Sequence, residues 1–183
     1  MKNTVNLGGY NNSNFNTGSG PLKRIVWHFV SGLFFKSFFH FYGLKVFLLK
    51  LFGAEIGMNV LIKPNVNIKY PWNLIVGNDV WIGEEVWIDN LVKVQIGNNV
   101  CISQGAMLLC GNHNFSKSNF DLITGTIILE DGVWIGAKSI VGPNVICHSH
   151  SVLGVSSVAS KDLEAYSIYR GNPALLIKER NIE

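Results

Sequence analysis

Apolar residues recur at every sixth position through most of this chain, and a second small or apolar residue often stands four positions after each of them. A short fixed period is typical of a solenoid, in which each repeat buries its apolar face only against neighbouring repeats. Six residues are too few for a pair of helices, but they fit a short strand and a tight turn. The periodic positions are Ile56, Ile62, Ile68, Val76, Ile82, Ile88, Ile96, Ile102, Leu108, Leu129, Ile135, Val141, Cys147, Leu153 and Ala159.

Residues that favour turns follow the same period. Glycine often stands one position after the apolar residue, and Gly, Asn or Asp often stands three positions after it. These residues tolerate a positive φ, so the pattern predicts a corner in every repeat. Three corners close a triangular coil of about 18 residues, whose strands stack roughly 4.8 Å apart. We therefore predict an all-β fold, a parallel β-helix of about five coils over residues 54–163. The expected corner residues are Asn59, Asn65, Asp79, Asn99, Gly105, Gly132 and Asn144.

An aromatic-rich segment precedes the repeats. We expect residues 21–53 to be helical, with Gly43 separating a first helix from a shorter one over 44–52. Lys36, Lys45 and Lys50 interrupt the apolar run, which excludes a membrane-spanning helix of about 20 apolar residues. Two interpretations stay open: the helix caps the first coil, or it lies at a membrane surface with Lys and Trp at the headgroups. A less apolar stripe of this helix contains His28, Gly32, Lys36, His40 and Gly43.

The bulk composition excludes several classes of protein. The 183 residues suit one principal domain, and a net charge of +3 with 15% charged residues argues against a nucleic-acid binder. The three cysteines are expected to be free thiols in a reducing cytoplasm, and no CxxC or HExxH spacing indicates a metal site. Residues 1–20 are polar and lack the features of a signal peptide, so we expect a flexible N-terminus and a cytoplasmic protein.

The largest interruption of the hexad period lies between Leu108 and Leu129, where the step is 21 residues. The polar segment 111–126 breaks the pattern, so we expect it to protrude from the solenoid wall as a loop. A departure from a strong structural rule tends to mark a functional site. At its start stands His113, whose imidazole can accept a proton from an attacking hydroxyl near neutral pH. His113 is therefore the candidate general base.

These motifs resemble the hexapeptide-repeat acetyltransferases, and among them the sugar O-acetyltransferases of the maltose, galactoside and nodulation-factor type. Three further stretches resemble the colanic acid biosynthesis branch of that family. The resemblance covers roughly residues 20–180. The family motifs are 111–113 (GNH), 133–136 (VWIG), 160–162 (SKD) and 171–174 (GNPA), and the branch motifs are 52–57 (FGAEIG), 68–73 (IKYPWN) and 102–105 (ISQG).

The resemblance implies a left-handed β-helix and a homotrimer, with each active site between two β-helices. It implies direct acetyl transfer from acetyl-CoA to a sugar hydroxyl in surface polysaccharide biosynthesis. The membrane-surface interpretation of the aromatic-rich segment would place this cytoplasmic protein at the inner face of the membrane. His113 then acts as the base, and backbone N–H groups around Gly136 and Ala137 meet the oxyanion. No metal is implied.

The resemblance also assigns residues to CoA. Trp134 and Val155 match positions along the pantetheine arm, and Ser160 and Lys161 match positions near the phosphates. Lys178, with Arg180, matches the basic residues on the adenosine 3′-phosphate. Pro173 and Gly171 belong to a C-terminal tail, residues 164–183, that is expected to fold over CoA.

Acceptor contacts are expected from the loop and from turn carboxylates. Asn112 and Asn114 flank His113, and Glu84 and Asp89 could contact the acceptor or orient His113 across a subunit boundary. The chain departs from the family at Gly83, where the sugar enzymes carry an acceptor-contacting Asn. It also departs at Ala137, where many members carry a hydroxyl residue.

Several alternatives remain open on sequence grounds. A γ-type carbonic anhydrase uses the same solenoid, but His148 and His150 fall on turns and lack a partnering His-x₄-His pair. A non-catalytic β-helix scaffold would not need His113. A streptogramin-type xenobiotic acetyltransferase shares the histidine loop, and an amino-sugar N-acetyltransferase needs the same base.

Overall fold

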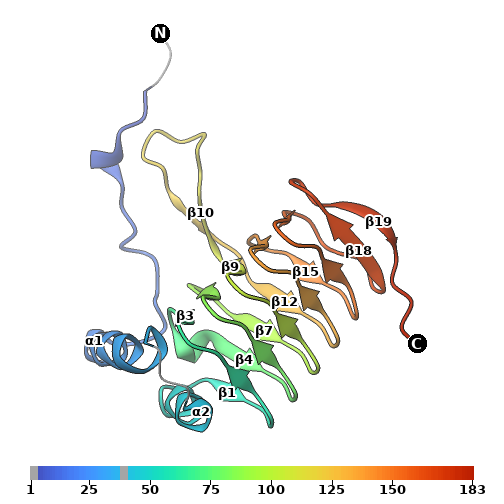
Figure 1. The fold of residues 1–183 in the computed structure, drawn as a ribbon. Coiled ribbons are helices and arrows are strands. Elements are labelled where there is room, and N and C mark those ends of the chain that lie inside the picture. The colour runs from blue at the N-terminus through green and yellow to red at the C-terminus, as the bar shows by residue number, and fades with distance from the viewer. Residues whose placement is uncertain (1–3, 38–40) are drawn as a thin grey trace.

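A computed structural model describes residues 4–37 and 41–183 as a β-solenoid of about six turns with helices at its N-terminal end (Figure 1). Three parallel sheets form the walls. Sheet A contains β1 (Glu55–Ile56), β4 (Leu74–Val76), β7 (Val94–Ile96), β12 (Ile127–Leu129) and β15 (Ile146–Cys147). Sheet B contains β2 (Leu61–Ile62), β5 (Trp81–Ile82), β8 (Cys101–Ile102), β13 (Trp134–Ile135), β16 (Val152–Leu153), β18 (Ser167–Arg170) and β19 (Leu175–Glu179). Sheet C contains β3 (Asn67–Ile68), β6 (Trp87–Asp89), β9 (Met107–Leu109), β14 (Ile140–Val141) and β17 (Val158–Ala159).

The hexad pattern correctly predicts the core. Every periodic apolar residue is buried, and the least buried of them, Ile56, is only 8% exposed. The residues expected at the corners also have the expected backbone, with φ from 56° at Asn59 to 72° at Gly132. Each coil thus stacks its apolar residues on those of the next coil, and the fold class predicted from the sequence is confirmed.

The coil length and the C-terminal end differ from the prediction. The first coils advance 20 residues, as in the pairing of Ile56 with Val76, because the turns 69–73 and 90–93 hold extra residues. Later coils advance 18, as in the pairing of Trp134 with Val152. After residue 163 the chain adds β18, which is parallel to β16, and β19 then pairs antiparallel with β18.

The N-terminal segment forms three helical elements rather than a long helix broken at Gly43. They are α1 (Pro21–Val30), the π-helical turn η2 (Ser31–Phe35) and α2 (Tyr42–Leu51). Gly43 lies inside α2, and the helical hydrogen bonds stop after Phe35, so the proposed break was wrong. Phe38, Phe39 and His40 lie outside the described residues.

Both helices dock on the first coil through buried polar contacts. The Trp27 indole N–H donates to the Ile68 carbonyl at 2.9 Å, and the Lys45 ammonium donates to the Lys63 carbonyl at 2.8 Å. Trp27 and Lys45 are 3% and 1% exposed, so these two side chains do not face a membrane surface as one interpretation required. Burial lowers the pKa of Lys45. No helix in the described part of the chain is long and apolar enough to cross a membrane.

Candidate active site

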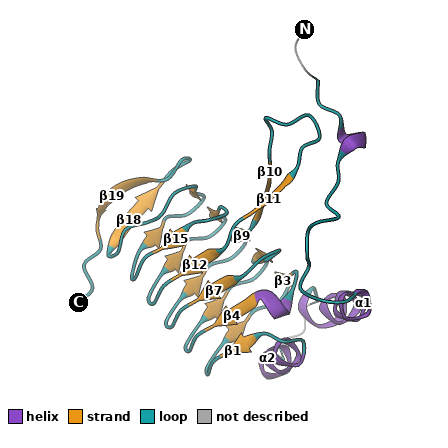
Figure 2. Cartoon of the chain, turned by 180° about the vertical axis from the view of Figure 1, so that it is seen from behind, coloured by secondary structure: helices purple, strands orange, loops and turns teal. Residues whose placement is uncertain are grey.

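The turns between strands form three edges along the solenoid, and we name two of them. The B–C edge contains residues 63–66, 83–86, 103–106, 136–139, 154–157 and 171–174. The C–A edge contains residues 69–73, 90–93, 110–126, 142–145 and 160–162. The interruption of the hexads lies on the C–A edge, where β10 (Gly111–His113) and β11 (Leu122–Thr124) form an antiparallel hairpin. The hairpin stands away from the wall (Figures 1 and 2).

The hairpin holds the ring of His113 in one orientation. Its Nδ1 lies 2.8 Å from the carbonyl oxygen of Phe120, and the two rings stack with centroids 4.8 Å apart. Phe120 has a φ of 57°, a conformation uncommon for an aromatic residue. Because a carbonyl can only accept, Nδ1 carries the proton and Nε2 has a free lone pair. The structure thereby supplies the group that orients His113, which the sequence did not identify.

The two asparagines beside His113 shape the hairpin. The Asn112 Oδ1 accepts a hydrogen bond from the His113 backbone N–H at 2.8 Å. The Asn114 Oδ1 accepts one from Ser116 at 3.1 Å, and the Asn114 backbone N–H donates to Asp121 across the hairpin. Their amide oxygens are thus engaged in the loop itself.

A cavity of about 390 Å³ lies beside His113 on the C–A edge. Asp89 lines it, at 2.8 Å from the ammonium group of Lys69. Glu84, the other candidate carboxylate, belongs to a cavity of about 280 Å³ on the B–C edge, together with Trp81. The structure therefore brings Asp89 and His113 together, but not Glu84.

Residues 4–20, which precede the helices, close one side of the His113 cavity. Sequence reasoning missed this role. The Asn6 N–H donates to the Ser118 carbonyl at the hairpin tip at 2.7 Å, and Tyr10 meets His113 edge-on with centroids 5.8 Å apart. Residues 4–20 run beside the hairpin in both ribbon views (Figures 1 and 2). The low complexity of this segment gave no signal of the contact, which depends on a turn more than 100 residues away.

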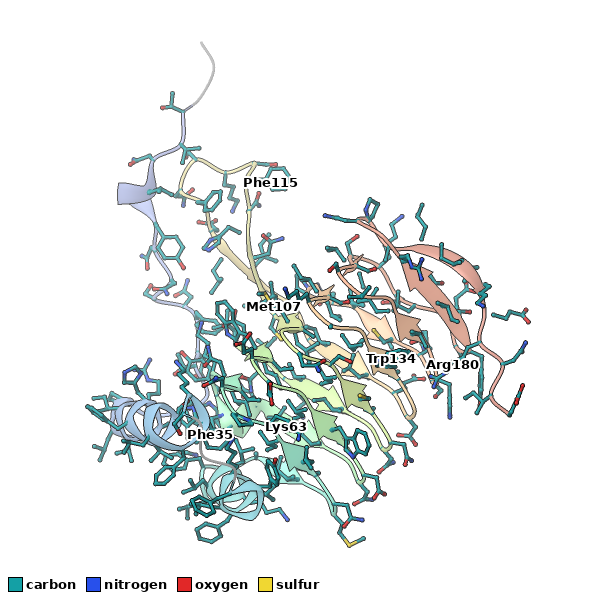
Figure 3. The ribbon with its side chains drawn as sticks, viewed as in Figure 1. Phe35, Lys63, Met107, Phe115, Trp134 and Arg180 are labelled. Carbon is teal, nitrogen blue, oxygen red and sulfur yellow. The ribbon has the colours of Figure 1, made fainter. Side chains whose placement is uncertain are left out.

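Four of the residues assigned to CoA gather along the B–C edge or beside it. Trp134 lies on sheet B, 46% exposed, with its indole N–H donated to the Ser103 hydroxyl at 2.9 Å (Figure 3). Ala137 and Val155 occupy successive turns, since the Ser156 N–H donates to the Ala137 carbonyl. Pro173 follows in the next turn of the same edge.

Gly136 has a structural role that excludes it as an oxyanion donor, which corrects our expectation. Its N–H already donates to the Leu153 carbonyl at 2.7 Å. A Cβ at this position would lie 2.7 Å from that same oxygen, so only glycine allows the coils to stack. Within the described part of the chain the N–H of Ala137 has no such partner, and it is the remaining candidate donor.

The remaining residues assigned to the CoA phosphates do not lie on the B–C edge. Ser160 and Lys161 are exposed on the C–A edge, and Lys178 is exposed on β19. Arg180 donates through Nη1 to the carbonyl oxygens of Gly132 and His150 at 2.9 and 3.0 Å, which fixes residue 180 against the turns that contain these two residues. A single chain therefore places Trp134, Ala137, Val155 and Pro173 on or beside one edge of the solenoid, while Ser160 and Lys161 lie on the same edge as His113.

Packing also explains the departure at Gly83. A Cβ there would lie 2.8 Å from the backbone nitrogen of Gln104 in the next coil. A side chain therefore does not fit at this position, and Gly83 makes no side-chain contact with an acceptor. Trp81, two residues earlier, is 63% exposed and pairs in register with Cys101, which pairs with Trp134. In the sequence, the repeated Trp-Ile-Gly triplet at 81–83 and 134–136 indicates the exposed face of sheet B on which the two tryptophans lie.

The three cysteines are free thiols. Burial raises the pKa of the Cys110 and Cys147 thiols to about 12, and burial also raises the pKa of Cys101. Thiolates are the reactive form, so Cys110 and Cys147 are poor nucleophiles near neutral pH. Among the described residues, no three His, Cys, Asp or Glu side chains are grouped so that they could hold a metal ion.

Comparison with known proteins agrees with this architecture, although no protein-family model matches the chain. The chain is 35% identical over 166 residues to WcaF of Escherichia coli K12, which is named as a colanic acid biosynthesis acetyltransferase, and the match covers 91% of each chain. It is 28% identical over 137 residues to galactoside O-acetyltransferase of the same organism, covering 73% of this chain and 68% of the relative.

Solved structures show the same fold. A hexapeptide-repeat acetyltransferase from Vibrio cholerae gives a TM-score of 0.80 at 18% identity, covering 96% of this chain and 98% of that one. A maltose O-acetyltransferase from Clostridium difficile 630 gives 0.76 at 21% identity, covering 88% of each chain. With the repeat, the histidine hairpin and the 35% identity to WcaF, the chain belongs to the hexapeptide-repeat sugar O-acetyltransferase family and is an acetyltransferase.

Proposed function

We propose that this protein transfers the acetyl group of acetyl-CoA directly to a hydroxyl of a saccharide in surface polysaccharide biosynthesis. The observation that carries the proposal is the orientation of His113 beside a cavity: Nδ1–H is donated to the Phe120 carbonyl, and Nε2 has no partner among the described residues. The WcaF relative, named for colanic acid biosynthesis, supports the substrate class.

The proposed reaction needs no covalent enzyme intermediate. Nε2 of His113 takes the proton of the acceptor hydroxyl while its oxygen attacks the thioester carbonyl carbon. The negative charge that develops on the carbonyl oxygen is stabilised by a backbone donor, for which Ala137 N–H is the candidate. The C–S bond then breaks, the acetyl ester is formed, and the CoA sulfur receives the proton from His113.

Thiol release from acetyl-CoA tests the proposed function. A panel of free, nucleotide-linked and lipid-linked sugars is offered to the wild type and to His113→Ala. We expect acceptor-dependent thiol release by the wild type alone. Release that is independent of every sugar, or near-full activity in His113→Ala, contradicts the proposal.

We propose a homotrimer in which each active site combines the C–A edge of one copy with the B–C edge of another. The support is the separation within one chain: His113 and Lys161 lie on one edge, while Trp134, Ala137 and Val155 lie on or beside another. Acetyl-CoA would then lie in the groove between two copies, close to Trp134 and Val155. Lys161 and Lys178 supply positive charge for its phosphates.

Mixed trimers are expected to recover activity from two inactive variants. His113→Ala removes the base, and Ala137→Glu places a carboxylate on the B–C edge, so each variant alone should be nearly inactive. Refolded together in equal amounts, they should regain about a quarter of wild-type activity, because each intersubunit site draws its two edges independently. Assay of the mixture against the separate variants measures this. No recovery in mixed trimers, verified by size and by differential tagging, would show that one chain supplies both edges.

We propose that α1 and α2 hold the enzyme at the inner face of a membrane. Large apolar side chains remain exposed on both helices, including Phe29 at 65% and Phe47 at 60%. Lys50 is exposed on α2, as expected of an interfacial surface that contacts anionic lipids. The apolar face is Leu22, Ile25, Val26, Phe29, Leu33, Phe41, Leu44, Phe47 and Leu51.

Vesicle binding tests this face. Burying a Phe side chain contributes about 1.5–3 kcal/mol, so Phe29→Ser with Phe47→Ser should weaken binding to anionic vesicles at least tenfold. Co-sedimentation of wild type and variant with 30% anionic vesicles measures the effect, with Phe115→Ser on the hairpin tip as the control (Figure 3). Unchanged vesicle binding, or an altered trimer with no loss of binding, would contradict the membrane contact.

A further inference from the structure

Two adjoining cavities extend from His113 along sheet C to the end of α1. The first, of about 390 Å³, includes His113, and the second, of about 270 Å³, lies beneath Ser31 and Lys36. They share four lining residues, Arg24, Lys69, Tyr70 and Asp89. We call the pair the acceptor groove.

Two buried polar atoms in the acceptor groove have no partner within the described part of the chain. They are Nε of Arg24 and the hydroxyl oxygen of Ser31, whose side chain lines the groove at 4% exposure. Buried polar groups are nearly always hydrogen-bonded, so each such exception calls for an explanation. Arg24 and Ser31 stand seven residues apart, and the intervening Trp27 also lines the groove, so they share one helical face. Ser31 begins the π-helical turn η2, an element that often occurs at functional sites.

The charges of the acceptor groove do not balance. Arg24, Lys36 and Lys69 line it, against the single carboxylate of Asp89. Asp89 is already paired with Lys69 at 2.8 Å, so Arg24 and Lys36 face the groove without a carboxylate partner in the described chain. The other titratable groups along it are His28, His113, Tyr10 and Tyr70, and none of them is a carboxylate.

We propose that the acceptor is an anionic saccharide whose carboxylate or phosphate is bound by Arg24, with Ser31 and Lys36, while its hydroxyl is presented to His113. A planar guanidinium binds carboxylate and phosphate oxygens in the same paired geometry. Tyr10 and Tyr70 also line the acceptor groove. This inference rests on the proposed function, because it names the substrate class of the same site.

Binding without turnover tests the inference separately from the reaction. The His113→Ala protein, without acetyl-CoA, is titrated with glucuronic acid, glucose 1-phosphate and glucose, and binding is followed by NMR of the sugar. We expect both acids, or one of them, to bind at least tenfold more tightly than glucose. The uronic acid and the sugar phosphate distinguish a carboxylate in the saccharide from a phosphate that links it to a carrier. Equal binding of all three probes overturns the inference whether or not the protein is an acetyltransferase.

Substitutions locate the contact. Arg24→Gln should raise the Kd of the acidic probe about tenfold and leave that of glucose unchanged, and Arg24→Lys should retain part of the preference. Lys23→Gln is the matched control, because Lys23 is the adjacent cation on α1 but lies over the Trp72 ring, 5.0 Å from its centroid. If Arg24→Gln has a lowered melting temperature, Lys36→Gln replaces it, with a smaller loss in the same direction. An equal loss for glucose and the acid, or an equal effect of Lys23→Gln, overturns the assignment.

Discussion

Replacing His113 by alanine is expected to lower kcat by about 10²- to 10⁴-fold, the range that a general base contributes. The reason is local. The Phe120 carbonyl fixes the proton on Nδ1, so only Nε2 can take the hydroxyl proton, and nothing else in the hairpin replaces it. Trp134, Ala137 and Val155, which we assign to CoA, lie on or beside the other edge, so the KM for acetyl-CoA should change less than threefold. Steady-state kinetics with acetyl-CoA and the acceptor measure both constants.

The control for this prediction is a second histidine. His148→Ala removes the same side chain from a turn between sheets A and B, where His148 contacts Glu130 at 3.1 Å. It should retain near-wild-type kcat. A loss in His148→Ala as large as that in His113→Ala would point to a general structural effect. A rise in KM with an unchanged kcat in His113→Ala would point to a role in binding.

Alkaline pH is expected to destabilise the fold steeply because of its two buried thiols. Cys110 and Cys147 have pKa values of about 12 in the folded chain, against a reference value of 9.0. Between these values the folded state holds protons that the unfolded state releases, so stability is fully present below pH 9 and falls as pH rises. Above pH 9 each thiol lowers the free energy of unfolding by about 1.4 kcal/mol per pH unit. Together they lower it by roughly 3 kcal/mol between pH 8 and 10.

Denaturant unfolding from pH 7 to 10 measures this dependence. Lys45 acts in the opposite direction, because its pKa is lowered in the folded chain and it therefore adds stability as pH approaches 10.5. The pH dependence of the wild-type free energy of unfolding alone therefore does not isolate the thiols. The difference in free energy of unfolding between the wild type and the double variant Cys110→Ala, Cys147→Ala isolates the two thiols. The contributions of Lys45 and Cys101 are the same in both proteins and cancel. That difference should shrink by roughly 3 kcal/mol over this range. A pH-independent difference would show that neither thiol is kept protonated by the fold.

The fold was predictable because its signal is local and repeated. A six-residue step places one residue such as Ile102 in the core and another such as Asn99 at a corner, and the same physics recurs in every coil. The helices before the repeats were harder to predict. Their boundaries depend on where η2 ends after Phe35, and the buried amine of Lys45 is stabilised by carbonyl groups of the first coil.

The candidate site was predictable only in part. His113 stood out because the repeat fails there. The partner of His113, Phe120, could not be inferred, since the contact is made by a backbone carbonyl whose direction depends on the hairpin. Likewise the sequence offered Gly136 as an oxyanion donor, whereas the ladder between coils already uses its N–H.

The sequence by itself determined the solenoid, its buried ladder and the point where the chain leaves it, because each depends on residues near one another in the chain. Only the tertiary structure decided which residues meet. It separated His113 from Trp134 and Ala137 on different edges, and it brought Tyr10 and Arg24 into the cavity beside His113. These relations depend on how coils stack and where the N-terminal segment packs. A periodic pattern specifies the same buried and turn positions in every coil, and so contains no information about such distant contacts.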